Sequence, residues 1–494
     1  MTTYHQATVA DADTALRAAD ACFDEFRSLP PARRAELLEE IALGIEALGE
    51  ELIETAHRET ALPMARLQGE RARTCNQARM FAKLILDGTW LDARIDHGDP
   101  ERQPLPKPDV RLMMQPLGPV VVFGASNFPL AISVAGTDTV SALAAGCPVI
   151  VKAHSAHPQT CALVAGAIKA AVAKLGLPAG VFAMFHGSGR DIGMALVKHP
   201  LTCAVTFTGS LLGGRAIYDA ACARPQPIPF YGEMSSINPV FLLPDALAER
   251  AEKIAATFLT SLTMGVGQFC TNPGVIIGVD GPDWRNFLTE SSNLVKLWQP
   301  ATMLHGGICD AYCAGVERFS QLPGVTVLAT SAAAPGDAQA AAILFGVSAV
   351  DFLARHEFDE EVFGPASVAV TCRDTADLLA VVESLDGQLS ASIHGTAGDL
   401  LKHARLVRIL ERKAGRIIFN GYATGIEVCH AMHHGGPYPA TTHAYFTSIG
   451  SAAIRRFVRP VCYQDFPDDA LPAAIQEGNP TRAWRLVDGK MADC

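Results

Sequence analysis

The sequence predicts an α/β fold with a parallel sheet, because short apolar runs alternate with segments of helical character. Nearly continuous apolar runs are typical of strands that are buried on both faces, as parallel strands are. Five such runs within residues 120–233 predict a Rossmann-type, nucleotide-binding lobe. They are Val120–Ala125, Pro148–Ala153, Gly180–Gly187, Ala204–Ser210 and Pro227–Glu233.

Helices are expected before and between these strands. In the first 90 residues, apolar side chains such as Leu37, Ile41 and Ile45 recur at helical spacing, with charged residues on the other face. The proline-rich stretch at residues 99–109 breaks this pattern and is expected to be an extended arm. The helices expected between the strands are Thr137–Ala145, Pro158–Leu175, Ile192–Lys198 and Leu212–Cys222.

A second α/β lobe is expected from Ser236 to Ala423, followed by a tail rich in histidine and glycine with a helix near Ala452–Phe457. We therefore predict a dinucleotide-binding domain at 1–98 and 115–235, a catalytic domain at 236–423, and an oligomerisation arm and tail at 99–114 and 424–494. Strands of the second lobe are expected at Gly274–Val279, Ala342–Phe345, Ser367–Cys372 and Gly415–Asn420.

The composition excludes several classes of protein. The chain has 494 residues, 49% of them hydrophobic and 18% charged, which excludes a disordered chain. A formal charge of −11 argues against binding to nucleic acid or to an anionic membrane. No signal peptide and no long apolar span are evident, so the 13 cysteines are expected to be mostly core thiols in a reducing cytoplasm.

Two residues are candidates for catalysis. Cys270 lies in a glycine-rich turn, GVGQFCTNPG, where a thiol is accessible as a nucleophile; the alternative is a small buried residue. Glu233 ends an apolar run, and the carboxyl end of a parallel strand faces the ligand crevice. Glu233 is therefore a candidate general base, against the alternative of a solvated residue at the end of a strand.

Several residues at predicted strand ends are candidates for binding a dinucleotide. The stretch HGSGRDIG matches the glycine fingerprint imperfectly, while Gly209 and Ser210 open a helix whose amides can hold a phosphate. Lys152 follows a strand at which NAD sites often carry an acidic residue. Lys152 and Arg190 are alternatively placed to face a 2′-phosphate, or are simply solvated.

The tail contains the pattern H-x-x-H-H, formed by His430, His433 and His434. No predicted helix holds these residues at the spacing of metal ligands, and glycine and proline follow at once. We therefore expect no metal there, and favour structural or substrate-facing histidines.

Taken in order, six segments resemble the aldehyde dehydrogenase superfamily, and the resemblance covers nearly the whole chain. Glu233 also lies 37 positions before Cys270, which is similar to the family's spacing between base and nucleophile. The resemblance implies an aldehyde-dehydrogenase-like fold and oxidation of an aldehyde with NAD or NADP. The six segments are ASNFP, VIVKAH, FTGS, GEMSSINP, GQFC and EVFGP.

The resemblance implies a role for each matching residue. Cys270 matches the nucleophile, Glu233 the base, and Asn127 the amide that forms an oxyanion hole with the backbone N–H of Cys270. On the cofactor side, the matches are Lys152 for the adenosine ribose, Gly209 and Ser210 for the pyrophosphate, and Glu361 and Phe363 for the nicotinamide ribose and ring.

The sequence departs from the family pattern at three places. Ser126 replaces the tryptophan that often precedes Asn-Phe-Pro, and Ser235-Ser236 replace the usual Gly-Gly after the glutamate. Ser155 replaces an acidic residue three positions after the lysine. Losing that carboxylate removes repulsion of a 2′-phosphate, so NADP is slightly favoured over NAD, with Arg190 available to bind it.

The tail is similar to a subgroup that contains 2-oxoglutarate semialdehyde (2,5-dioxopentanoate) dehydrogenases and a bacterial fatty-aldehyde dehydrogenase. By that resemblance, His430 is expected near Cys270, and a homodimer or homotetramer is expected. The leading substrate is 2,5-dioxopentanoate, whose distal carboxylate requires an arginine or a set of N–H donors; Arg111, Arg416 or a residue of the tail are the candidates. The alternatives are a fatty aldehyde, or a cofactor-independent hydrolase that uses Cys270 with His430.

Overall fold

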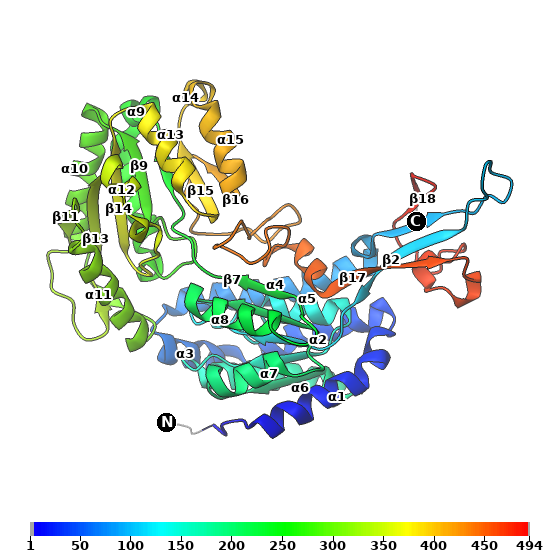
Figure 1. Cartoon of the computed structure of the whole chain (residues 1–494). Helices are drawn as coiled ribbons and strands as arrows, with labels where there is room; N and C mark the ends of the chain where they lie inside the picture. Colours follow the sequence, from blue (N-terminus) through cyan, green and yellow to red (C-terminus); the bar gives the residue numbers. More distant parts are fainter. Residues whose placement is uncertain (1–3, 493–494) are drawn as a thin grey trace.

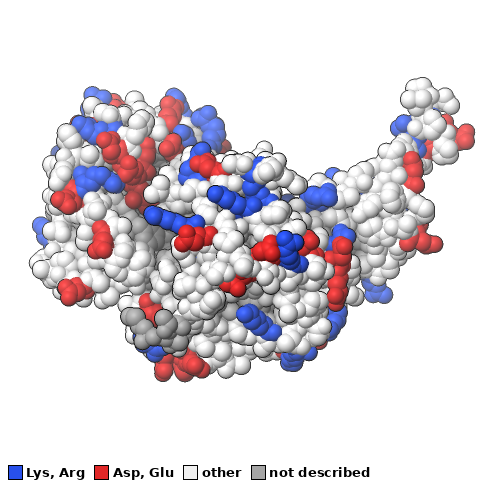
Figure 2. All heavy atoms as spheres, turned by 60° about the horizontal axis from the view of Figure 1, so that its bottom comes forward, with Lys and Arg blue, Asp and Glu red and all other residues white. Residues whose placement is uncertain are grey.

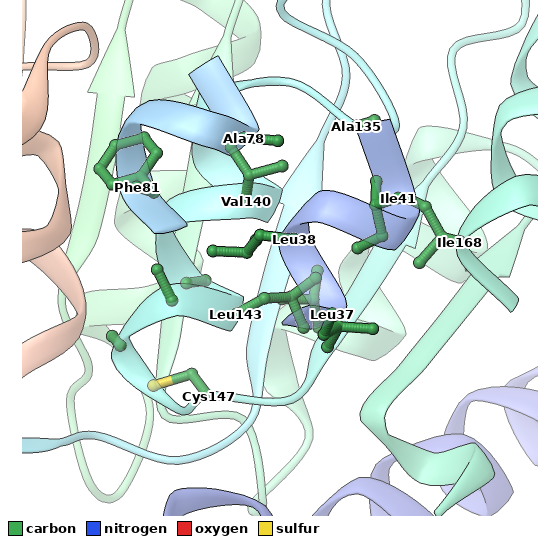
Figure 3. Packing of buried hydrophobic residues seen from close by; sticks show 14 of the residues in the cluster. Leu37, Leu38, Ile41, Ala78, Phe81, Ala135, Val140, Leu143, Cys147 and Ile168 are labelled. Carbon is green, nitrogen blue, oxygen red and sulfur yellow. The ribbon is translucent and has the colours of Figure 1, made fainter. Parts of the chain in front are cut away.

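Four amphipathic helices from the start of the chain form one side of the lower lobe in the computed structural model, which describes residues 4–492 (Figure 1). Their apolar faces form a core in which Leu38 of α2 and Phe81 of α4 pack near Val140, as Figure 3 shows. The expected helical start is confirmed, and the four helices are α1 (Val9–Arg27), α2 (Pro31–Ala47), α3 (Gly49–Thr60) and α4 (Met64–Asp87).

A five-stranded, wholly parallel sheet forms the centre of the lower lobe, in the order β5-β4-β3-β6-β7. From the central strand β3 the chain first runs outward through β4 and β5, and then returns to β6 and β7 on the other side. The carboxyl ends of all five strands therefore share one edge, which is where ligands bind in open α/β sheets. The strands are β3 (Val120–Phe123), β4 (Val149–Lys152), β5 (Phe182–Phe185), β6 (Ala204–Thr208) and β7 (Phe230–Glu233).

The helices between these strands match the predicted positions, with one difference. The helix expected from Ile192 begins at Met194, because Gly189–Gly193 forms a π-helical turn first. The helices are α5 (Thr137–Ala145), α6 (Pro158–Lys174), α7 (Met194–Lys198) and α8 (Leu211–Cys222).

The upper lobe contains a seven-stranded sheet in the order β11-β13-β14-β9-β8-β15-β16, in which only the edge strand β11 is antiparallel (Figure 1). All four strands expected here are present, whereas β8, β11 and β15 were not expected. The strands are β8 (Val240–Leu242), β9 (Val275–Val279), β11 (Thr326–Thr330), β13 (Ile343–Ser348), β14 (Ala366–Cys372), β15 (Gln388–His394) and β16 (Ala414–Phe419).

Helices flank this sheet, and a small ribbon of two strands, β10 (Ala301–Thr302) and β12 (Gln339–Ala340), lies outside it. The helices are α9 (Pro244–Thr263), α10 (Pro282–Leu297), α11 (Gly306–Ser320), α12 (Ala349–Leu353), α13 (Thr375–Ser384), α14 (Ala397–Lys402) and α15 (Ala404–Lys413).

An arm protrudes from the two lobes and joins distant parts of the sequence (Figures 1 and 2). Its sheet has the order β17-β2-β1-β18-β19, and residues 99–109 contain no helix, as expected. The tail helix expected near residues 452–457 is a 3₁₀ helix, Ser451–Phe457, at the base of β17. The strands are β1 (Ala93–Asp96), β2 (Val110–Pro116), β17 (Val458–Gln464), β18 (Arg485–Val487) and β19 (Lys490–Ala492).

The charge distribution concerns binding to nucleic acid, and the lengths of the helices concern insertion into a membrane. On the face shown in Figure 2, acidic and basic side chains are intermixed rather than gathered into a basic patch. Among residues 4–492, no helix is both long enough and apolar enough to cross a membrane. The cysteines in the same range are all free thiols.

Two loops of the upper lobe touch at a pair of glycines. Gly267, which lies three residues before Cys270, has φ of +66°, and a Cβ built there would lie 2.3 Å from the carbonyl carbon of Gly364. Asn272 Nδ2 donates to the oxygen of the same carbonyl at 3.0 Å. The turn around Cys270 is therefore held against residues 361–365 by backbone contact that only glycine permits.

Replacing Gly267 with alanine should reduce the free energy of unfolding by about 2–4 kcal/mol, because the added methyl group strains φ and overlaps backbone atoms. The midpoint of thermal denaturation measures the effect. Gly281→Ala is the matched control, since Gly281 has an extended backbone and open space around its Cβ position. Equal midpoints for the two variants would contradict this interpretation of the contact.

Candidate active site

The Cys270 thiol lies in the turn between α9 and β9, half-buried at the junction of the two lobes. Its Sγ is 3.6 Å from His434 Nε2. Asn238 Nδ2 donates to the backbone carbonyl of Cys270 at 2.8 Å, and to that of Asn272 at 3.0 Å. These bonds fix the turn from the segment before β8, so the thiol is held in place by a residue outside its own loop.

Glu233 ends β7 with its carboxylate directed at the same histidine. Its Oε1 is 3.2 Å from His434 Nε2, and its Oε2 accepts a 2.8 Å hydrogen bond from Ser448 Oγ. The tail reaches this position because it pairs with β7: Glu233 forms a bridge with Thr441, and the Met234 amide donates to the Ala440 carbonyl. Glu233 and His434 are 4% and 1% exposed, so their contact is shielded from bulk water.

The three side chains form one compact cluster. One ligating atom each from Glu233, Cys270 and His434 all lie within 4.8 Å of one another. Thiol, imidazole and carboxylate at this spacing can exchange a proton, and they are also groups that bind soft cations.

The prediction that His430 lies beside Cys270 is wrong; the histidine in contact with the thiol is His434. His430 is exposed, and its Nδ1 is 3.0 Å from Ser451 Oγ instead. Both histidines belong to one short motif, and no local pattern distinguishes them. What selects His434 is its position in the fold, where its amide donates to Thr447 Oγ1 at 2.8 Å and its ring is buried against β7.

Burial and charge set the ionisation of the cluster. Burial opposes ionisation of Glu233, but the interactions with His434 and the hydrogen bonds from His434 and Ser448 lower the pKa of this carboxyl to about 2. Burial and the Glu233 carboxylate raise the pKa of the Cys270 thiol well above its ordinary value. Before substrate binds, the site therefore holds a carboxylate beside a protonated thiol.

Asn127 lies on the loop after β3 and approaches Cys270 from the lower lobe. Its Nδ2 donates to the Gln268 carbonyl at 3.1 Å, and Arg66 Nη2 donates to the Asn127 carbonyl at 2.7 Å. Glu70 accepts hydrogen bonds from the amides of Leu130 and Ala131. Helix α4 thus anchors the loop and holds the Asn127 amide at the entrance to the cluster.

The predicted cofactor residues gather at the carboxyl edge of the parallel sheet. Lys152 ends β4 and is 9% exposed, and within residues 4–492 its ammonium group has no hydrogen bond or ion pair. Ser210 caps α8, and the Gly209 amide donates to the Glu233 carbonyl at 3.1 Å. Ser155 and Arg190 are exposed near the same edge, after β4 and β5. A buried lysine and the N-terminus of a helix at the same sheet edge fit the hydroxyl and phosphate groups of a dinucleotide.

Glu361 and Phe363, the residues expected at the nicotinamide ribose and ring, lie beside the Cys270 turn in the upper lobe. Both line a pocket together with Gly267 and Phe269, in the segment that Gly364 joins to the Cys270 turn. Burial raises the pKa of Glu361 to about 8. A largely protonated carboxyl group there can donate as well as accept hydrogen bonds from ribose hydroxyls.

Ser448 and the anchoring residues of α4 were not predicted from the sequence, and His434 was named only as a member of the H-x-x-H-H pattern. Ser448 is one of many serines in the tail, and only its bond to Glu233 distinguishes it. The α4 residues lie on a helical face whose polar members, such as Glu70, are buried. A buried acidic residue within an apolar helical stripe is the one signal that could have indicated them.

Comparison with known proteins identifies the family of the chain. A family model described as the aldehyde dehydrogenase family matches residues 1–296. Alpha-ketoglutaric semialdehyde dehydrogenase 2 of Azospirillum brasilense is 56% identical over 484 residues, which cover 98% of this chain and 92% of that protein. An alpha-ketoglutaric semialdehyde dehydrogenase of Acinetobacter baylyi is 46% identical over 487 residues, with the same coverage of both chains, 98% and 92%.

Solved structures agree in fold. Betaine aldehyde dehydrogenase of Staphylococcus aureus, in complex with NAD⁺, superposes with a TM-score of 0.80 at 18% identity, over 94% of this chain and 90% of that one. The glyceraldehyde-3-phosphate dehydrogenase GapN of Methanocaldococcus jannaschii, complexed with NADP, gives 0.78 at 19% identity, over 94% and 96%. On the family match and the two long alignments, the chain belongs to the aldehyde dehydrogenase family.

Proposed function

We propose that this enzyme oxidises 2,5-dioxopentanoate, the semialdehyde of 2-oxoglutarate, to 2-oxoglutarate. The observation that carries the proposal is the contact of Cys270 with His434 and Glu233, a nucleophile and a base around one reactive position. The substrate is supported by the two relatives named alpha-ketoglutaric semialdehyde dehydrogenases, whose similarity extends over nearly the whole chain.

The first step requires a thiolate, whereas the resting site favours the thiol. In our proposal His434 Nε2, which lies 3.6 Å from Sγ, takes the proton of Cys270, and the Glu233 carboxylate, 3.2 Å from the same nitrogen, stabilises the resulting imidazolium. A thiolate formed only when substrate is present attacks the aldehyde carbon and avoids side reactions. The Cys270 sulfur then carries a thiohemiacetal.

The developing oxyanion needs donors that are fixed in advance. Asn127 Nδ2 has a second N–H besides the one directed at Gln268, and the backbone N–H of Cys270 is its partner in the proposed oxyanion hole. A nicotinamide dinucleotide, which Lys152, Ser210 and Glu361 would hold, would supply the acceptor for the hydride of the aldehyde carbon. The product on Cys270 is a thioester.

Glu233 is the proposed base for hydrolysis of the thioester. With a pKa of about 2 it is ionised at neutral pH, and it can take a proton from water that attacks the acyl carbon. Sulfur leaves as thiolate, and the carboxylic acid is released. Ser448 orients the carboxylate by donating to Oε2.

Members of this family use NAD or NADP, and we propose a slight preference for NADP here. Ser155 carries no charge to repel a 2′-phosphate, while Lys152 and the exposed Arg190 supply positive charge at the same edge. In this proposal, residues 1–98 and 115–235 form the domain that binds the cofactor, and residues 236–423 form the domain that carries the nucleophile.

Purified enzyme should reduce NAD or NADP with 2,5-dioxopentanoate, and kcat/KM should be higher with NADP. Absorbance of the reduced cofactor measures the reaction, with both cofactors tested side by side against decanal as an alkyl aldehyde. Cys270→Ala should reduce the rate by at least about 10³-fold, because no other group forms the thioester. Greater activity on decanal would overturn the substrate assignment, and acyl hydrolysis without cofactor would indicate the hydrolase alternative.

Glu233→Gln should lower the apparent pKa of the Cys270 thiol, because the carboxylate that opposes ionisation is removed. At pH 8 the variant should therefore react faster with iodoacetamide at Cys270, as measured by peptide mass spectrometry over a range of pH. Glu51→Gln, an exposed position on α3, is the control and should behave as the wild type. An unchanged or raised pKa in Glu233→Gln would refute the proposed coupling.

We also propose that the arm mediates homodimer or homotetramer formation. It protrudes from the lobes (Figure 1), and it exposes several large apolar side chains that a monomer would leave in water: Leu105, Phe466, Trp484 and Met491. Light scattering on purified protein should give a mass that is a multiple of the chain mass. Replacing Phe466 and Trp484 together with serine should shift the protein toward monomer; a monomeric wild type would contradict the proposal.

A further inference from the structure

Helix α4 carries two arginines, Arg66 and Arg73, that lie against the catalytic loops. The guanidinium carbon of Arg66 is 5.0 Å from the centre of the Phe128 ring and 4.8 Å from that of Phe269. The guanidinium carbon of Arg73 is 5.5 Å from the centre of the Phe128 ring. Phe128 follows Asn127 and Phe269 precedes Cys270, so both arginines border the wall beside the oxyanion hole.

Arg73 has no partner within the described part of the chain, residues 4–492. Its side chain makes no hydrogen bond or ion pair, although Nε and Nη2 are buried. Two buried guanidinium nitrogens without an acceptor are costly, and they are stabilised when an anion supplies both charge and acceptor oxygens. Arg73 is therefore available for a ligand.

The acidic residues that the structure describes nearby do not accept a hydrogen bond from the Arg73 guanidinium. Glu70, one turn before Arg73, uses Oε1 to accept from two backbone amides and makes no ion pair with either arginine. Glu427 acts on Arg73 only through space and is exposed. Arg66 differs from Arg73, because its Nη2 already donates to the Asn127 carbonyl. This face of α4 thus holds two half-buried arginines and one buried carboxylate.

The arginines considered from the sequence are less suitable. Arg111 lies in the arm, where it forms ion pairs with Asp109, Asp468 and Glu477. Arg416 of β16 donates from both terminal nitrogens, to the carbonyls of Ala423 and Gly425, and only its buried Nε has no partner among the described residues.

We infer that Arg73 binds the distal carboxylate of the substrate, an inference that rests on the proposed function. The aldehyde and carboxylate carbons of 2,5-dioxopentanoate are separated by four bonds, which span about 5 Å when extended. The Arg73 charge already acts on Cys270, since it opposes the effects that raise the pKa of that thiol. A planar fork with free N–H groups can hold a carboxylate through two parallel hydrogen bonds. Phe128 packs against the guanidinium and limits its movement.

The test compares a charged and an uncharged substrate of equal chain length. In Arg73→Met, kcat/KM for 2,5-dioxopentanoate should fall by about 10–100-fold, mainly through KM, because charge-assisted hydrogen bonds are lost. With pentanal, kcat/KM should change by less than about threefold, because pentanal never made those bonds. With pentanal as substrate, 2-oxoglutarate should inhibit the wild type and inhibit Arg73→Met less.

Matched variants separate binding from folding. Arg79→Met removes an arginine from the same helix, where it pairs with Glu39 and Glu46 at the surface, and should leave both substrates unaffected. Arg73→Lys keeps the charge without the fork and should be intermediate. If Arg73→Met does not fold, as judged by thermal denaturation, Arg73→Lys and Arg73→Gln provide the same comparison.

The outcomes distinguish the inference from the proposed function. A wild type that does not oxidise 2,5-dioxopentanoate refutes the proposed function. A wild type that prefers 2,5-dioxopentanoate, with Arg73 variants that keep this preference, refutes the role of Arg73 alone. Equal losses on both substrates also overturn it, since they would indicate a purely structural arginine.

Discussion

The structure depends on one contact, in which three distant segments bring a thiol, an imidazole and a carboxylate within 4.8 Å of one another. Glu233 comes from the end of a strand in the lower lobe, Cys270 from a turn in the upper lobe, and His434 from the tail. A buried carboxylate is costly unless it is paired. His434 and Ser448 supply that pairing, so the tail must dock on β7 before the site exists.

The remaining charges near the site are arranged around this cluster. Asn127 belongs to a loop that α4 holds through Arg66 and Glu70, so the oxyanion donor is positioned from a different element than the nucleophile. Carboxyl groups at Glu233 and Glu361 oppose ionisation of the thiol, whereas Arg73 of α4 favours it. The distal carboxylate of a substrate would lie on the side of the α4 arginines. The side of Glu361 would then remain for the ribose of the cofactor.

The sequence predicted the parts of the fold that follow from local hydrophobicity. β3 and β4 are runs of valine and isoleucine, and such runs indicate buried parallel strands. β15 was missed because it is rich in polar residues, yet it is fully buried: Ser390 Oγ donates to Asn238, and Gln388 accepts from Ser236. These partners are remote in the sequence, so no local pattern predicts them. The same limit explains why His430 and His434 could not be distinguished.

The Ser235-Ser236 pair bears on how far Glu233 can move during the reaction. Ser236 Oγ lies within hydrogen-bonding distance of Asn238 Oδ1 and Gln388 Oε1, at 3.0 and 2.9 Å, and Gln388 also accepts from the Ile237 amide. The backbone after Glu233 is thus tied to β15, where Gly-Gly would leave it free. With the following segment fixed and the carboxylate held by His434 and Ser448, Glu233 stays beside Cys270. In the proposed mechanism Glu233 would therefore activate water from this position, with rotation of its side chain alone.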